Sequence, residues 1–140
     1  MSSDCSTLQP EMRILFLDTV HDHLASHLTR MDHECIDGCK LTREELLPQI
    51  ADYDGIVIRS RIKLDKELLD AAKNLRFIAR AGAGMENIDV EHAKMLGVQC
   101  FNAPEGNRDA VAEHAIGMLL TLFNHINTAD IEVRKGQWLR

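Results

Sequence analysis

The chain has 140 residues, the length of about one ordinary domain or of one small domain with an appendage. Hydrophobic residues make up 45% of it and charged residues 27%, a composition that supports a buried core and excludes an intrinsically disordered chain. The formal net charge of −6 and the aromatic content of 4% argue against nucleic acid as a partner, because phosphates need cations and bases need aromatic rings.

Neither a membrane span nor a leader is expected. No apolar run approaches the roughly eighteen residues that cross a bilayer. Residues 1–12 are polar, without a basic segment followed by an apolar one, so we expect a disordered tail rather than a signal peptide. The expected location is the cytoplasm.

The cysteines and histidines do not form a metal-binding pattern. Cys35 and Cys39 lack a second pair at zinc-ribbon spacing, and His23 and His27, four residues apart on a predicted helix, lack an acidic third ligand. We therefore expect no metal site and interpret the histidines as solvated surface residues. Cys100 lies in an apolar run and is expected to be a buried core thiol.

Five short apolar runs predict buried strands. In chain order they lie at residues 13–17, 34–36, 55–58, 76–79 and 98–101. Capping signals predict helices between them: Asp18 and Thr19, the Thr42–Glu45 capping box, Asp65 and Asp89 each precede a helical pattern, and Gly97 ends the last one. Because the runs are continuous rather than alternating, the strands are expected to be covered on both faces. Residues 13–101 are thus predicted to form a flavodoxin-like, doubly wound α/β domain with a parallel sheet.

Residues 102–140 have a different pattern. Asn107 is expected to cap a long helix whose apolar residues, among them Val111, Leu119 and Phe123, fall on nearly every side. A sheet domain that is complete at residue 101 covers only one side of such a helix. We therefore expect a second domain, a second copy of the chain, or both to cover the rest. A further helix is expected at residues 128–135.

The segment from Gly82 to Asn87 follows the fourth predicted strand and allows three interpretations. It matches the dinucleotide fingerprint G-x-G-x-x-G except at Asn87, but that fingerprint normally follows the first strand of its domain. A plain tight turn is the second interpretation. In the third, the exposed backbone N–H groups of the loop bind a small carboxylate.

Cationic side chains flank this segment. Arg80 ends the same strand, and Arg59, Arg61 and Lys63 follow the third strand, so all four are expected at one edge of the sheet. Guanidinium groups pair bidentately with carboxylates and phosphates, so this concentration in an acidic chain favours an anion site at Arg59 and Arg80. Lys63 is expected to be a solvated loop charge.

Two other chemistries are not supported. Glu113 and His114 are adjacent on a predicted helix, about 100° apart, and cannot act as an acid–base pair. A phosphoacceptor receiver domain has the same topology and needs acidic residues after its first and third strands. Asp18 meets the first requirement, but Arg59 stands at the second place.

Three segments together resemble a known family. They are Arg59-Ser60-Arg61, then Arg80-Ala81-Gly82-Ala83-Gly84-x-x-Asn87-Ile88-Asp89, then Asn102-Ala-Pro104-x-x-Asn107-x-x-Ala110-Val-Ala-Glu113-His114, followed by Gly136-x-Trp138. In order and spacing they resemble the amino-terminal part of the D-2-hydroxyacid dehydrogenases. Within that family, the Arg-Ser-Arg element and Arg80 are most similar to the members that oxidise D-3-phosphoglycerate in the NAD-dependent first step of serine biosynthesis. Ile62 and Glu86 depart from the family's frequent Thr and Asp, which leaves the exact substrate open.

The resemblance implies a role for each of these elements. The backbone of Ala81, Gly82, Ala83 and Gly84 would hold the carboxylate of a small anionic 2-hydroxyacid or 2-oxoacid. The side chains that would face its distal anionic group are those of Arg59, Ser60, Arg61 and Arg80. Ala83 and Asn107 would border NAD. The long helix would cross into the start of a cofactor domain, residues 102–140, and pack in a homodimer or larger homo-oligomer.

No catalytic residue is expected within this chain. The family's cofactor fingerprint, its acidic ribose-binding residue and its catalytic Arg, Glu and His would all lie beyond residue 140. The resemblance therefore predicts an oxidoreductase of which these 140 residues alone are inactive. The alternative is a non-catalytic anion-binding or regulatory module with the same fold.

Overall fold

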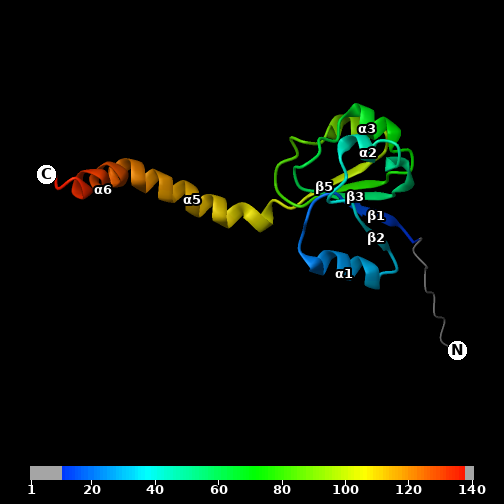
Figure 1. Ribbon diagram of the computed structural model, residues 1–140, viewed down its shortest axis with the longest axis horizontal. Helices are drawn as coiled ribbons and strands as arrows, with labels where there is room; N and C mark the ends of the chain where they lie inside the picture. The colour runs from blue at the N-terminus through cyan, green and yellow to red at the C-terminus, as the bar shows by residue number, and fades with distance from the viewer. Residues whose placement is uncertain (1–10, 138–140) are drawn as a thin grey trace. The chain divides into compact units, whose positions relative to one another are not determined.

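In a computed structural model, which describes residues 11–137, the chain divides into two compact units (Figure 1). The first unit ends at Ala103 and the second begins at Pro104. Nearly all of the tail predicted at residues 1–12, and Trp138 of the family pattern, lie outside the described residues. No helix in the described part of the chain is long and apolar enough to cross a membrane.

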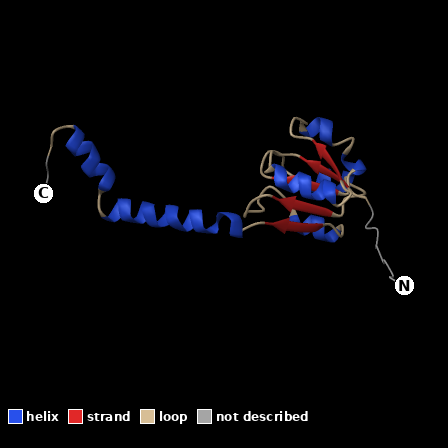
Figure 2. Cartoon of the chain, turned by 90° about the horizontal axis from the view of Figure 1, so that it is seen from below, coloured by secondary structure: helices blue, strands red, loops and turns tan. Residues whose placement is uncertain are grey.

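The first unit contains one parallel sheet of five strands (Figure 2). The strands are β1 (Arg13–Phe16), β2 (Glu34–Asp37), β3 (Gly55–Ile58), β4 (Phe77–Arg80) and β5 (Gln99–Asn102), in the order β2-β1-β3-β4-β5. Each pair of neighbours is parallel. This order confirms the predicted doubly wound, flavodoxin-like α/β sheet, and no strand boundary differs from its predicted position by more than one residue.

Helices cover the two faces of the sheet unequally. They are α1 (Asp22–Arg30), α2 (Arg43–Leu46), the 3-10 turn η1 (Ile50–Asp52), α3 (Lys66–Ala71) and α4 (Val90–Met95). In Figure 1, α1 lies on one face and α2 and α3 lie on the other. Ala93 of α4 packs in the same buried cluster as Leu46 of α2 and Leu68 of α3, so α4 shares their face. The predicted helix at residues 42–50 is divided into α2 and η1, because Pro48 lacks the N–H that would continue the helix.

In the first unit, the predicted caps hold at three helices and fail at the fourth. Thr42 and Glu45 form the reciprocal capping box of α2, and the carboxylates of Asp65 and Asp89 accept from the third N–H of α3 and α4. The prediction that Asp18 or Thr19 caps the first helix is wrong, because α1 begins at Asp22 and His21 Nδ1 accepts the N–H of His23. The carboxylate of Asp18 is engaged elsewhere.

The core lies mainly between the sheet and the three helices on its more covered face. Fully buried side chains there include Ile56, Ile58 and Leu68. A smaller cluster of Ile14, Phe16 and Val57 faces α1. Cys100 is only half-buried, contrary to its prediction as a core thiol, because β5 is an edge strand with a neighbour on one side only. These clusters fix the strands whose carboxyl ends carry the candidate site.

The second unit consists of two helices, α5 (Glu105–Phe123) and α6 (Ile126–Arg134). The predicted cap Asn107 is instead the third residue of α5, whose N-cap is Pro104. A proline suits this position because its fixed φ is close to the helical value and its missing N–H would be unpaired there anyway. The apolar side chains of α5 are exposed in this structure. A homodimer through α5 stays a prediction.

Candidate functional site

The carboxyl ends of β1, β3 and β4 lie side by side, because these strands are parallel neighbours in the sheet. Three loops therefore meet at one edge of the first unit: residues 17–21, residues 59–65 and residues 81–89. Ligands of doubly wound sheets bind at this edge. The structure thus gathers the loops that carry the predicted substrate-binding residues.

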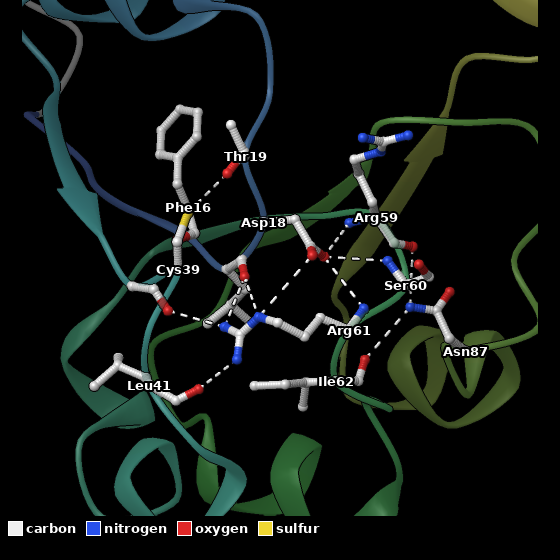
Figure 3. Close-up of polar contacts among 12 residues, drawn as sticks. Phe16, Asp18, Thr19, Cys39, Leu41, Arg59, Ser60, Arg61, Ile62 and Asn87 are labelled. Atoms are coloured by element: carbon white, nitrogen blue, oxygen red, sulfur yellow. Dashed lines mark hydrogen bonds and ion pairs between the residues drawn. The ribbon is translucent and has the colours of Figure 1, made fainter.

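The loop after β3 is built around the carboxylate of Asp18, which follows β1. Its Oδ2 accepts hydrogen bonds from three consecutive backbone N–H groups, those of Arg59 (2.7 Å), Ser60 (3.1 Å) and Arg61 (3.4 Å) (Figure 3). The side chain of Asp18 is 15% exposed. Sequence analysis missed this role because the capping pattern offered Asp18 a local partner. The available signal was an acidic residue placed directly after a buried strand, beside the end of the next strand in the sheet.

The guanidinium of Arg61 is turned toward the protein rather than toward solvent. It donates twice to Leu17 O (2.9 and 2.7 Å), once to Gly38 O (2.9 Å) and once to Leu41 O (2.6 Å). Its Nε also lies 4.0 Å from Oδ1 of Asp18. Four of its five N–H groups are thus engaged. This geometry supports a structural role for Arg61 in place of the predicted contact with a ligand.

Arg59 and Ser60 present their side chains differently from Arg61. Both residues are exposed, and in Figure 3 the Arg59 guanidinium extends away from the Asp18 network. Within residues 11–137 it has no hydrogen-bond or ion-pair partner. Arg59 is therefore available to an anion, whereas its backbone N–H is not.

The glycine-rich loop after β4 is anchored through its carbonyl groups. Gly82 O accepts the N–H of Ala103 at 2.9 Å, and Ala83 O accepts Nδ2 of Asn102 at 2.6 Å. Both donors follow or end β5, the neighbouring strand. The loop is thus tied to the sheet on the side of β5.

The N–H groups of the same loop are only partly used. Ala81 N donates to Ile58 O at 2.8 Å, whereas the N–H groups of Ala83 and Gly84 have no acceptor in the part of the chain that the structure describes. Two adjacent unpaired N–H groups form the kind of concavity that binds anions. This arrangement is the one that the carboxylate-binding interpretation requires.

The guanidinium of Arg80 lies against Gly82, so that a Cβ atom at residue 82 would overlap it. Arg80 Nε is buried and has no partner among the described residues. A buried N–H without an acceptor costs free energy, so an anion held at this loop would supply a partner that Arg80 lacks. Gly84 makes room in the same way for the carboxylate of Glu86.

The geometry argues against the dinucleotide interpretation of this loop. In that fingerprint the pyrophosphate sits at the N-terminus of the helix that follows the glycines. Here α4 begins only at Val90, and its N-terminus is already occupied by the carboxylate of Asp89, which accepts His92 N at 3.0 Å. A cofactor pyrophosphate does not fit residues 82–87.

Asn87, the residue that breaks the fingerprint, joins the two candidate loops. Its Nδ2 donates to Arg59 O (3.2 Å) and Ile62 O (3.4 Å). Next to it, Leu64 and Ile88 form a parallel β-bridge. From the sequence, Asn87 was only a missing glycine of the fingerprint and a member of the family pattern, whereas the structure shows that it holds the β3 loop to the β4 loop.

The remaining candidates do not add reactive groups to this edge. Burial is the main cause that raises the pKa of the Cys39 thiol, which disfavours a thiolate nucleophile. His21, His23 and His27 are exposed, as predicted. No group of three or more His, Cys, Asp or Glu residues that could hold a metal ion occurs within residues 11–137. Asn107 lies in the second unit, and its contact with a cofactor stays a prediction.

The fold and this edge agree with one family of proteins. Residues 14–135 match the family model described as "D-isomer specific 2-hydroxyacid dehydrogenase, catalytic domain". The chain therefore belongs to the D-isomer-specific 2-hydroxyacid dehydrogenases, a family of oxidoreductases.

Within this family, the curated relatives include D-3-phosphoglycerate dehydrogenases. The chain is 37% identical over 129 residues to that of Archaeoglobus fulgidus, an alignment that covers 92% of this chain and 24% of the relative. The chain thus spans about a quarter of the length of this relative. The recognition made from the sequence motifs is confirmed.

Solved structures of the family agree with the fold. The PH0520 protein from Pyrococcus horikoshii superposes with a TM-score of 0.85 at 27% identity, over 94% of this chain and 39% of that one. NAD⁺-bound 3-phosphoglycerate dehydrogenase of Entamoeba histolytica superposes with a TM-score of 0.65 at 31% identity, over 80% of this chain and 39% of that one. Both comparisons support the α/β fold with its parallel sheet.

Proposed function

We propose that the chain is the substrate-binding part of an NAD-dependent dehydrogenase that acts on an anionic D-2-hydroxyacid, D-3-phosphoglycerate, or on the matching 2-oxoacid. The observation that carries the proposal is the pairing of two loops at one edge of the sheet. One loop offers unpaired N–H groups at Ala83 and Gly84, and the other offers the unpaired guanidinium of Arg59. Two separate cationic or N–H-rich subsites suit a ligand with an anionic group at each end.

The residues of this chain would bind and orient the substrate. The carboxylate beside the reacting carbon would accept the N–H groups of Ala83 and Gly84 and lie near Arg80. The distal phosphate would pair with the side chains of Arg59 and Ser60. Holding both ends fixes the C2–H bond in one direction, which is how binding groups contribute to rate. Arg61 would not contact the substrate, and its hydrogen bonds to backbone carbonyl groups would keep the loop in place.

NAD, when bound, supplies the hydride acceptor, and residues outside this chain would have to hold most of it. The N-terminus of α4 is already capped by Asp89, so it is not free to bind the pyrophosphate of NAD. This supports a cofactor site that lies mostly outside this chain. Ala83 and Asn107 would border the nicotinamide end. The 140 residues alone would therefore bind substrate without turning it over.

The cellular setting follows from the same proposal. A 3-phosphoglycerate dehydrogenase would act in serine biosynthesis, in the cytoplasm, as a homodimer or larger homo-oligomer. Within residues 11–137 the thiols of Cys35, Cys39 and Cys100 form no disulfide, which suits a reducing compartment. The exposed apolar side chains of α5 suit association with a second copy.

Binding by the chain itself tests the proposal. We expect an NMR titration with D-3-phosphoglycerate to shift the amide signals of Ala83 and Gly84. Arg59→Ala and Arg80→Ala should each weaken binding about tenfold, the effect of losing one charged hydrogen bond. Arg76→Ala is the matched control, since Arg76 is an exposed arginine at the opposite end of β4. Unchanged affinity in both site variants would contradict the assignment.

Turnover separates the proposal from a non-catalytic anion-binding or regulatory module. We expect the chain alone to leave NADH unconsumed in the presence of the 2-oxoacid. The longer protein that contains this chain and a cofactor domain should consume it. If that longer protein binds the anion without turnover, the regulatory module is the correct function.

A further inference from the structure

We propose that Asp18 is a positioning residue for the anion site, because it fixes the loop from which Arg59 and Ser60 reach the ligand. This inference rests on the proposed function, since it assigns Asp18 to the subsite for the distal anion. Asp18 follows β1, whereas the loop that it holds follows β3. The contact therefore joins segments that lie 41 residues apart in the chain.

The backbone geometry of the loop carries the argument. Three consecutive N–H groups converge on one oxygen of Asp18, at 2.7, 3.1 and 3.4 Å. Successive N–H groups that converge in this way form an anion-binding nest. Here the nest is filled by a carboxylate of the protein itself. Residues 59–61 can therefore offer an anion only their side chains, and the direction of those side chains depends on Asp18.

The negative charge of Asp18 is balanced by the guanidinium of Arg61. Arg61 Nε lies 4.0 Å from Oδ1 of Asp18, and its other donors are bonded to the carbonyl groups of Leu17, Gly38 and Leu41. Arg61 and Asp18 thus offset each other within the protein. The positive charge that remains for a ligand at this edge comes mainly from Arg59 and Arg80, which have no acidic partner among residues 11–137.

A second contact holds the same loop from the opposite side. Asn87 donates from Nδ2 to Arg59 O and Ile62 O, so the backbone at residue 59 is fixed both at its N–H and at its carbonyl. With both groups of one peptide segment engaged, Arg59 has its backbone direction set before a ligand arrives. Removing the Asp18 contact leaves only the Asn87 side of this support.

Asp18→Asn tests the inference with little change in shape. The amide keeps one oxygen but loses the charge that attracts three N–H donors, so the loop should loosen. We expect the affinity of the chain for D-3-phosphoglycerate to fall about tenfold, while its affinity for D-glycerate, which lacks the phosphate, stays unchanged. Asp22→Asn is the matched control, because Asp22 is an exposed aspartate in the first turn of α1.

A double variant tells positioning from a general structural defect. If Asp18 acts through Arg59, Asp18→Asn should not weaken phosphoglycerate binding further in a chain that already carries Arg59→Ala. An equal loss for D-glycerate and D-3-phosphoglycerate, or a full additional loss in the double variant, would overturn the positioning role.

Hydrogen exchange of the unaltered chain tests the contact without any variant and without a ligand. The amides of Arg59 and Ser60 lie in an exposed loop, yet their bonds to Asp18 should slow their exchange well below that of the N–H groups of Ala83 and Gly84. Equally fast exchange at all four amides would overturn the inference. If the unaltered chain binds both ligands equally, the proposed substrate is wrong, and these exchange rates alone decide whether Asp18 holds the loop.

Discussion

The two units of the chain differ in whether their large apolar side chains are buried. In the first unit, Leu68 on α3 is fully buried together with the strands that it covers. In the second, Leu122 and Phe123 at the end of α5 are each 71% exposed. The first unit has the core of a self-sufficient domain, whereas α5 has the composition of a core helix without a core of its own unit around it.

The difference follows from which elements each unit contains. A parallel sheet with helices on both faces encloses its apolar strands completely. Two helices in sequence share only one seam, and α5 is apolar on nearly every side, so α6 can cover a small part of it. Residues 104–137 therefore present an apolar surface that suits burial against another protein surface.

The largest expected effect is on the stability of the first unit. Leu68→Ala should lower its free energy of unfolding by about 2–5 kcal/mol, because a fully buried leucine leaves a cavity. Leu122→Ala, the same substitution in α5, should change it by less than about 0.5 kcal/mol. Urea denaturation of both variants measures the difference, and equal losses would contradict the division into a packed unit and an exposed helix.

The next effect concerns association of the chain. Leu122→Asp should weaken any self-association through α5 by about a hundredfold, since a charge would have to be buried in an apolar contact. Sedimentation velocity over a range of concentrations measures this. Lys135→Gln at the C-cap of α6 serves as the comparison, because it alters an exposed charge outside the apolar part of α5. An unaltered chain that stays monomeric throughout would contradict the prediction.

A glycine in each unit should respond differently to the same substitution. At Gly82 a new Cβ overlaps the end of the Arg80 side chain, so Gly82→Ala should cost at most about 1 kcal/mol of stability while it weakens anion binding about tenfold. At Gly117, in the interior of α5, no described atom outside the helix backbone lies within 4 Å of a new Cβ, so Gly117→Ala should strengthen helix α5 by about 0.5–1 kcal/mol. Circular dichroism and ligand titration measure the two effects. A gain in anion affinity for Gly82→Ala would show that Arg80 is not part of the site.

The smallest effect is a pH dependence in the first unit. Arg43 donates to Asp65 at 2.9 Å, and this hydrogen bond is the main cause that holds the pKa of Asp65 below its ordinary value. A lowered pKa means that the pair stabilises the fold above about pH 4, the ordinary pKa of aspartate, and that this contribution is lost as the pH falls through the folded value.

Arg43→Gln should therefore lower the stability of the first unit only slightly at neutral pH, since Arg43 and Asp65 are both partly exposed to solvent, and the loss should shrink below about pH 4. Urea denaturation midpoints of both proteins, measured from pH 7 to pH 3, follow this loss of stability. Arg134→Gln breaks the exposed Arg134–Asp130 pair of α6 and should leave the midpoint of the first unit unchanged at every pH. A loss that persisted undiminished at pH 3 would show that Arg43 acts by packing and not by its charge.

Much of the fold was predictable because its signals are local. Continuous apolar runs identified the strands, and the Thr42–Glu45 box, Asp65, Asp89 and Gly97 marked helix ends by contacts that span four residues or fewer. The alternation of strands and helices, with right-handed crossovers, predicted the flavodoxin-like doubly wound sheet. The predicted caps failed at Asp18, where a distant partner competes for the side chain, and at Asn107, because α5 begins two residues earlier, at Glu105.

The sequence predicted where the candidate site lies, but not which of its side chains face solvent and which face the protein. The motif Arg59-Ser60-Arg61 names two arginines of the same chemistry, and their spacing does not show that one faces solvent and the other faces the protein. The Arg61 guanidinium makes four hydrogen bonds to three carbonyl groups that follow β1 and β2, while that of Arg59 has no acceptor among the described residues.

The sequence by itself determined the parallel α/β sheet, the family and the edge at which charged side chains gather, because apolar runs, caps and motif spacing are properties of neighbouring residues. Only the tertiary structure decided that Asp18 fills the nest of the Arg59 loop and that Asn87 joins two loops. The physical reason is that a hydrogen bond forms wherever an acceptor meets a donor. Which groups meet across 41 residues of chain depends on the packing of the strands between them.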